Sequence, residues 1–112
     1  MFVVDFYFQD GKVSPITKFL DLCDVKLRTK ILRQLKYVEI CGLNQAIPNL
    51  RKLINTPLWE VRILGRDNIR IICGNLKDRK VVVLSIFRKK TAKTPAIELT
   101  KALERYKKVL DP

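Results

Sequence analysis

The chain has 112 residues, of which 47% are hydrophobic, and it carries 23 lysines and arginines against 11 acidic residues, for a formal net charge of +12. The hydrophobic share excludes a disordered tail protein, and the length predicts a single domain over residues 1–112. So large a basic excess predicts an anionic partner, which is nucleic acid, an anionic membrane surface or an acidic protein.

Metal ligands are scarce in the sequence, which has no histidine and three widely spaced cysteines, Cys23, Cys41 and Cys73. Because a zinc site needs three or four ligands, we expect no metal and no other cofactor, and we interpret the cysteines as buried free thiols in a reducing cytoplasm.

Asp5 and Asp10 interrupt the apolar N-terminal stretch. We therefore expect a cytoplasmic protein without a signal peptide and without a membrane partner.

The first half of the chain predicts one strand followed by two helices. Residues 2–8 are rich in β-branched and aromatic side chains, which favour a strand. A Ser-Pro pair, an N-cap residue followed by proline at the first helical position, predicts a helix at about residues 15–23. An aspartate can cap a second helix over about residues 24–42, where apolar residues recur at the helical period. Residues 43–57 predict an ordered connection that has room for one helical turn near Leu50.

The second half predicts three strands and a last helix. Residues 58–64 and 69–73 alternate between apolar and polar side chains, and residues 81–88 form a third run of β-type residues. A Thr-Pro pair at residues 94–95 predicts the start of the last helix. The expected order is β-α-α-β-β-β-α, with helices on one face of the sheet and cations on the other face, which is open or partly open. The predicted apolar stripe of the last helix is Leu99, Leu103, Tyr106 and Leu110.

The arginines of these strands share one face only if the connection between the strands has the right length. A three-residue loop places Arg62 opposite Arg70, whereas a four-residue loop places them on opposite faces. Glu60 lies on the same face as Arg62, because side chains two residues apart in a strand point the same way. We expect a sheet face on which several cations have no matching acids, and such a face suits an anionic ligand.

Three blocks of the second half carry a resemblance to a known family. They are residues 58–62 (Leu-Trp-Glu-Val-Arg), residues 69–71 (Ile-Arg-Ile) and residues 87–95 (Phe-Arg-Lys-Lys-Thr-Ala-Lys-Thr-Pro), followed by an amphipathic helix. In type and order the blocks resemble the RelE/ParE toxin superfamily, above all its HigB-like, phage-derived branch. The resemblance implies a compact α+β fold with a small, twisted, mainly antiparallel sheet, an N-terminal helix pair packed against it and a C-terminal helix.

The resemblance also implies a function. The protein is expected to be the toxin of a type II toxin–antitoxin system, acting as a ribosome-dependent, metal-independent mRNA endoribonuclease that inhibits translation. The implied partners are the ribosome, mRNA and a cognate antitoxin, a HigA-like helix-turn-helix protein. Two alternatives stay open, a gyrase-poisoning toxin of the ParE type and a nucleic-acid-binding module without catalysis. The cluster of cations on the strand face favours the nuclease.

Metal-free RNA cleavage uses the 2′-hydroxyl of the substrate, which attacks the adjacent phosphorus and leaves a 2′,3′-cyclic phosphate. Arginine suits the stabilisation of charge on the phosphorane, so Arg62 and Arg70 are catalytic candidates, with solvated strand residues as the alternative interpretation. Ser85 stands where many relatives have a histidine, so the base must be Lys, Glu, Asp or Tyr. Lys89 is the candidate, because nearby arginines would lower its pKa, and Glu60 competes with it.

Four residues are candidates for contacts with the substrate. Lys90 and Lys93 follow the last strand and are interpreted as phosphate contacts. Phe87 is a candidate for stacking on a base, with a position in the core as the more frequent role for such a residue. The substrate-binding candidates are therefore Glu60, Phe87, Lys90 and Lys93, and the catalytic candidates are Arg62, Arg70 and Lys89.

Overall fold

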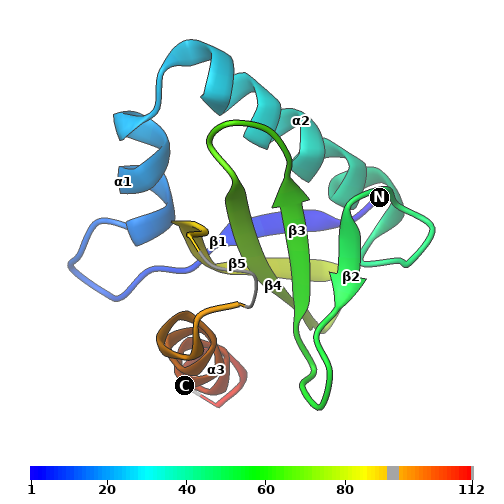
Figure 1. Ribbon diagram of the computed structural model, residues 1–112. Helices are drawn as coiled ribbons and strands as arrows, with labels where there is room; N and C mark the ends of the chain where they lie inside the picture. The colour runs from blue at the N-terminus through cyan, green and yellow to red at the C-terminus, as the bar shows by residue number, and fades with distance from the viewer. Residues whose placement is uncertain (91–93, 112) are drawn as a thin grey trace.

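The computed structural model describes residues 1–90 and 94–111 of the chain (Figure 1). Its elements follow the predicted order, with one additional strand after the second helix. In chain order the elements are β1 (Val3–Phe6), α1 (Pro15–Leu22), α2 (Val25–Cys41), β2 (Leu50–Lys52), β3 (Trp59–Ile63), β4 (Ile69–Leu76), β5 (Lys80–Arg88) and α3 (Ala96–Leu110).

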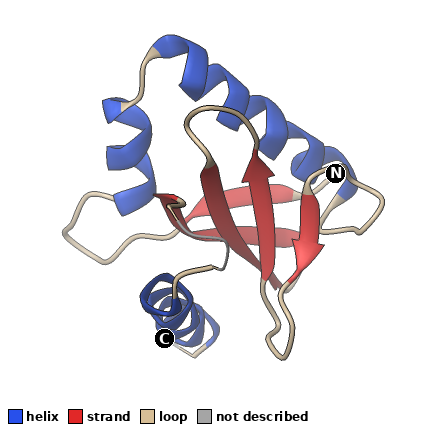
Figure 2. Cartoon of the chain, in the orientation of Figure 1, coloured by secondary structure: helices blue, strands red, loops and turns tan. Residues whose placement is uncertain are grey.

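The five strands form one mixed sheet in the order β1-β5-β4-β3-β2. β1 is parallel to β5, and the other neighbouring pairs are antiparallel. The sheet is therefore mainly antiparallel, as predicted, with β1 at one edge and β2 at the other. Figure 2 shows how the strands cross between the helices, with α1 and α2 on one side and α3 on the other.

The expectation of a helical turn near Leu50 is wrong, because this residue begins the edge strand β2. Leu50 is buried and pairs with Val61, while Arg51 lies opposite Glu60. Asn49 precedes the strand with a φ of 64°, which lies outside the region of a right-handed helix. The additional strand thus brings an arginine to the sheet face on which the site was predicted.

Helices α1 and α2 cover one face of the sheet and enclose the larger core (Figure 1). Their ends follow the sequence signals, because Ser14 accepts a hydrogen bond from the Ile16 amide at 3.2 Å and Asp24 accepts one from the Leu27 amide at 2.8 Å. Gly42 ends α2 with a φ of 75°, as expected for a glycine at a helix C-terminus. The buried side chains of the two helices are Ile16, Leu20, Leu27, Ile31, Leu35 and Val38.

Helix α3 packs on the opposite face of the sheet, so the expectation that the helices share one face is wrong, and the face that carries the cations is partly covered (Figure 2). Ala102 is fully buried at the centre of this contact, and its small side chain lets the helix approach the sheet closely. The predicted apolar stripe is wrong at two positions, since Leu103 and Leu110 are 36% and 55% exposed. The residues of α3 that pack beside Ala102 are Leu99, Tyr106 and Val109.

Two of the three cysteines are buried, as predicted, whereas Cys41 is exposed at the end of α2. Burial raises the pKa of the Cys73 thiol to about 12, so this side chain stays neutral and packs as a small apolar group. Within the described ranges, no helix combines the length and the apolar character needed to cross a lipid bilayer.

Tyr106 connects α3 to β4 at a glycine. The Tyr106 hydroxyl donates a hydrogen bond to the carbonyl oxygen of Asn75 at 2.6 Å. A Cβ atom on Gly74 would lie 2.6 Å from Tyr106 Cε1, well inside contact distance. Glycine is disfavoured inside strands, and here it makes room for the aromatic ring that positions the helix.

We predict that Gly74→Ala destabilises the protein by about 1–3 kcal/mol, the usual cost of overpacking. Urea unfolding measures the change as a shift of the midpoint. Gly11→Ala is the control for loss of a glycine, because no atom lies within 4 Å of its Cβ position and only its φ of +76° adds a backbone cost. Combining Gly74→Ala with Tyr106→Leu should cost less than the sum of the two single changes, and strict additivity would refute the contact.

Candidate functional site: a cation-lined sheet face

The predicted site residues converge on the sheet face that α3 partly covers. Arg62 of β3 lies directly opposite Arg70 of β4, which confirms the register expected from the shorter loop. Glu60 shares this face two residues earlier, and Arg51 of β2 lies opposite it. Because paired residues point to the same face of a sheet, the strand register alone brings these side chains together. We call the group formed by Arg51, Glu60, Arg62, Arg70 and Lys89 the cation face.

A buried carboxylate lies at the centre of the cation face, so the expectation of cations without a matching acid is wrong. Glu60 is fully buried. Its Oε1 atom accepts a hydrogen bond from Arg51 Nε at 3.3 Å and lies 3.2 Å from Arg51 Nη2. Its Oε2 atom accepts a hydrogen bond of 2.6 Å from the Thr94 hydroxyl. A carboxylate in the interior requires such partners, because an uncompensated buried charge is costly.

The two central arginines retain free hydrogen-bonding capacity. Arg70 is 4% exposed, and its Nη1 donates to the Ile69 carbonyl oxygen at 3.0 Å. Its Nε lies 3.9 Å from Glu60 Oε1, an ion-pair distance that is too long for a hydrogen bond. In the part of the chain that the structure describes, the buried Nε atoms of Arg62 and Arg70 have no hydrogen-bond partner. Such an unsatisfied donor costs about 1–3 kcal/mol.

The electrostatics of the cation face favour an added anion. Burial is the largest cause that lowers the pKa of Arg70, Arg62 lowers it further, and Glu60 opposes both. Glu60 is the single carboxylate of the cation face, and the cations around it are Arg51, Arg62, Arg70 and Lys89. A phosphate-like anion would accept from the free arginine donors and would offset the repulsion among the cations.

Lys89 follows β5, and Asn68 holds its backbone. The Lys89 amide donates to the Asn68 carbonyl oxygen at 2.8 Å, and Asn68 Nδ2 donates to the Lys89 carbonyl oxygen at 2.8 Å. Lys89 is 8% exposed. Burial is the main cause that lowers its pKa, Glu60 opposes this, and Arg70 adds to the lowering. The predicted direction is confirmed, although burial contributes more than the arginines.

The segment before α3 and the first turn of the helix also reach the site. Thr94, which was expected to cap α3, bonds Glu60 instead, and Pro95 at the cap position makes no side-chain hydrogen bond. The hydroxyl of Ser85, which is 2% exposed, donates to Glu98 Oε1 at 3.1 Å. Ser85 stands where members of the family that the sequence resembles often have a histidine. Its buried hydroxyl bonds to α3.

Sequence reasoning missed three contributors to the site, Arg51, Asn68 and Thr94. Arg51 lies in a strand of three residues, which is too short to show an alternating pattern. Asn68 has a φ of 50° in the loop before β4 and meets Lys89 only because β4 and β5 pair. The proline after Thr94 signals the start of a helix, so the sequence pattern assigns Thr94 to the helix cap. It gives no sign of the hydrogen bond to the distant Glu60.

The remaining substrate-binding candidates are Phe87, Lys90 and Lys93. Phe87 lies opposite Arg70 on the same sheet face, but it is 7% exposed and packs in the core beneath α3, as the alternative interpretation of this residue expects. Arg88 pairs with Asp67 at 2.6 Å. Lys90 is exposed, and Lys93 lies outside the described residues. Over residues 1–90 and 94–111, no cluster of three or more side chains suited to hold a metal ion occurs.

Comparison with known proteins relates the chain to one family and to a solved structure. The model of a family described as "Phage derived protein Gp49-like" matches residues 18–107. The structure of the E. coli toxin RelE, an arginine-to-alanine double mutant in the free state, matches with a TM-score of 0.66 over 93% of this chain and 96% of that chain, at 17% identity. Curated proteins yield no match. The expected RelE-like α+β fold is thereby confirmed.

We predict that Lys89→Met stabilises the protein at neutral pH. Because folding lowers the pKa of Lys89, the unfolded chain holds this proton more tightly, and the wild type gains stability as the pH rises toward about 10.4. The advantage of Lys89→Met should therefore shrink over the alkaline range. Urea unfolding at several pH values measures it, with the exposed Lys90→Met as control. An advantage that grows with pH, or that Lys90→Met shares, would contradict the burial of a charged lysine.

Proposed function

The chain belongs to the phage-derived Gp49-like family, and we propose that it is the toxin of a toxin–antitoxin pair and cleaves RNA at the cation face. The observation that carries this proposal is the pair of buried Nε donors in Arg62 and Arg70, which have no acceptor among the described residues. A phosphodiester supplies acceptors and negative charge together, and the phosphorane that forms from it carries more charge. Such a site binds the transition state more strongly than the substrate.

We infer distinct roles for the charged groups. Arg62 and Arg70 contact the non-bridging oxygens of the scissile phosphate and stabilise the phosphorane. Lys89 takes the proton of the 2′-hydroxyl as this oxygen attacks phosphorus. The products are a 2′,3′-cyclic phosphate and a 5′-hydroxyl, since the leaving 5′-oxygen takes a proton from water as its bond to phosphorus breaks. Glu60 positions Arg51 and Arg70, since both of its oxygens already interact with protein groups, and this favours Lys89 as the base.

We further propose that the substrate is mRNA on the translating ribosome in the cytoplasm. A hollow of about 220 Å³ beside Arg62 is also lined by Lys30 and Arg33 of α2, so basic residues continue from β3 onto the helix. A net charge of +12 suits contact with an extended RNA surface. A free protein with this charge would bind RNA indiscriminately, so the charge also favours a partner that inhibits the toxin. We propose a cognate antitoxin, a HigA-like helix-turn-helix protein, whose acidic residues cover part of the basic surface.

We predict that expression of the chain without its partner arrests growth and creates new 5′ ends within the codons of translated messages. Primer extension on an induced message measures these ends, and the same message without a start codon is the control, because untranslated RNA should stay intact. Equal cleavage of both messages would identify a nuclease that does not need the ribosome. Loss of DNA supercoiling without new ends would identify a gyrase poison. RNA binding with neither effect would identify a binding module.

We predict that Arg70→Lys lowers the single-turnover cleavage rate on programmed ribosomes by roughly a hundred- to a thousandfold, with little change in ribosome binding. Lysine keeps the charge but lacks the guanidinium fork. Arg88→Lys is the matched control and should retain the wild-type rate, because Arg88 pairs with Asp67 outside the cation face. Lys89→Met should also lower the rate, by a factor that shrinks as hydroxide replaces the base at higher pH. Wild-type rates for both Arg70→Lys and Lys89→Met would exclude the cation face as the site of chemistry.

A further inference from the structure

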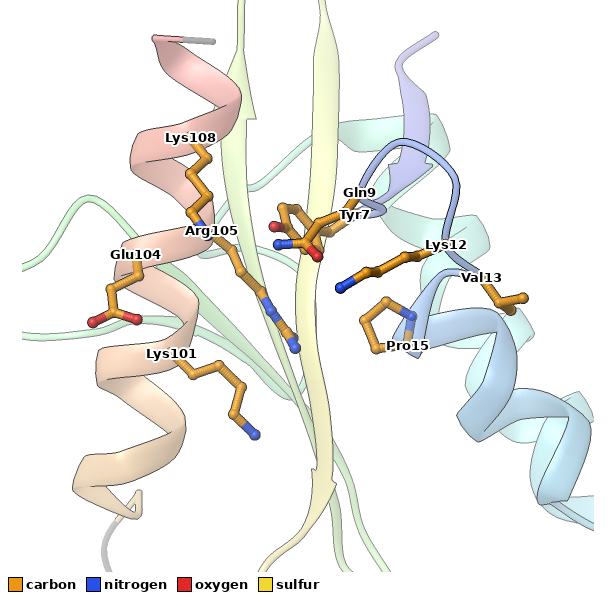
Figure 3. A pocket seen from close by; sticks show the side chains of 9 residues that line it. All are labelled: Tyr7, Gln9, Lys12, Val13, Pro15, Lys101, Glu104, Arg105 and Lys108. Atoms are coloured by element: carbon orange, nitrogen blue, oxygen red, sulfur yellow. The ribbon is translucent and has the colours of Figure 1, made fainter.

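A second basic region lies between α3 and the connection from β1 to α1 (Figure 3). It is a hollow of about 270 Å³, which we call the α3 pocket. Tyr7, Val13 and Pro15 form its apolar part. It shares no residue with the cation face. The charged residues that line the α3 pocket are Lys12, Lys101, Glu104, Arg105 and Lys108.

Arg105 is held in position before any ligand binds. Its Nη1 donates to the Leu84 carbonyl oxygen of β5 at 2.7 Å, and its guanidinium carbon lies 5.1 Å from the centre of the Tyr7 ring. These contacts use one of the five N–H donors and one face of the guanidinium plane. Figure 3 shows the guanidinium directed into the hollow, with the ammonium groups of Lys12 and Lys101 directed toward the same space. A pre-organised donor binds an anion with little ordering cost.

The α3 pocket has an excess of positive charge. The carboxylate in its lining belongs to Glu104, and this side chain points away from the hollow in Figure 3. Within the described part of the chain, Lys12, Arg105 and Lys108 take part in no ion pair. Lys101 pairs with Glu98 at 3.4 Å, so three cations remain without a protein carboxylate, and they line a hollow that has room for an anionic group.

We propose that the α3 pocket binds phosphate groups of an RNA strand, outside the stretch of RNA that the cation face holds. The proposal rests on the proposed function, because it takes the anion from an RNA substrate. Lys101, Arg105 and Lys108 follow one another at intervals of four and three residues on one side of α3, over roughly 10 Å of helix. A row of cations suits the repeated charges of a nucleic acid backbone.

Two further features favour RNA phosphates as the ligand. The α3 pocket and the cation face lie on the same side of the sheet, because Tyr7 and Leu84 belong to the core beneath α3. Helix α3 packs on β4 and β5 between the two sites, so one strand of RNA that reaches both has to pass over this helix. The ring of Tyr7 is 6% exposed and covered by Arg105, so this ring, the aromatic group in the lining of the α3 pocket, offers no face on which a base could stack. The α3 pocket thus contacts the sugar-phosphate backbone and binds RNA irrespective of its sequence.

The test is the binding of a fluorescently labelled single-stranded RNA that carries 2′-O-methyl groups throughout and so cannot be cleaved by its own 2′-hydroxyls. Lys12→Gln/Lys108→Gln removes two exposed charges of the α3 pocket. We expect weaker binding and a plot of log K against log salt whose slope falls by about 0.7 for each lost phosphate contact. Lys77→Gln/Lys80→Gln is the matched control, because it removes two exposed charges at the turn between β4 and β5 and should leave affinity and slope near the wild type.

Equal effects of the two double variants would overturn the proposal, since binding would then follow net charge alone. Unchanged RNA binding in the Lys12→Gln/Lys108→Gln protein, with loss of binding to a polyglutamate peptide, would assign the α3 pocket to an acidic protein and would overturn it as well. Cleavage assays on ribosomes test the proposed function separately from RNA binding by the α3 pocket. Wild-type RNA binding that depends on the α3 pocket, without any cleavage, would reject the nuclease and leave the pocket in place.

Discussion

The buried carboxylate of Glu60 is the interaction on which the surrounding sheet face depends. It joins β3, to which it belongs, to Arg51 of β2, to Arg70 of β4 and to Thr94 in the segment before α3. A carboxylate without exposed surface is tolerated in the folded state only when cations and donors surround it. One charge therefore holds an edge strand, two central strands and the entry into the last helix in a single arrangement.

The negative charge of Glu60 does not balance the cations that it gathers. Arg62 and Arg70 lie opposite each other across paired strands, an arrangement of like charges that disfavours strand pairing. Their Nε atoms find no acceptor among the described residues, and Lys89 is buried nearby with a lowered pKa. Departures from the usual rules of folding are expected where a ligand supplies what is missing. A phosphate at this face would relieve the repulsion and satisfy the donors, so the cost in the free protein and the proposed activity have the same physical origin.

Most elements of the fold follow from residues that are close together in the chain. Ser14 and Asp24 cap the first two helices as their positions predict, since a cap involves only the next two or three residues. The alternation of side chains in β3 and β4 limits Arg62 and Arg70 to two arrangements, and the structure has the one expected from a three-residue loop, with the two residues opposite each other. The period of a strand indicated which side chains could share a face, and the chemistry of arginine and the family resemblance selected Arg62 and Arg70 among them.

Contacts between distant segments decided the rest. Three residues with no pattern of their own become β2 only by pairing with β3, and this brings Arg51 to Glu60. The side of α3 that faces the sheet follows from the close approach at Ala102, and Arg105 is thereby placed in the α3 pocket. The sequence by itself determined the elements and the types of charge that they carry. Only the tertiary structure decided which charges are buried, paired or free, because the cost of burying a charge depends on neighbours that no local pattern encodes.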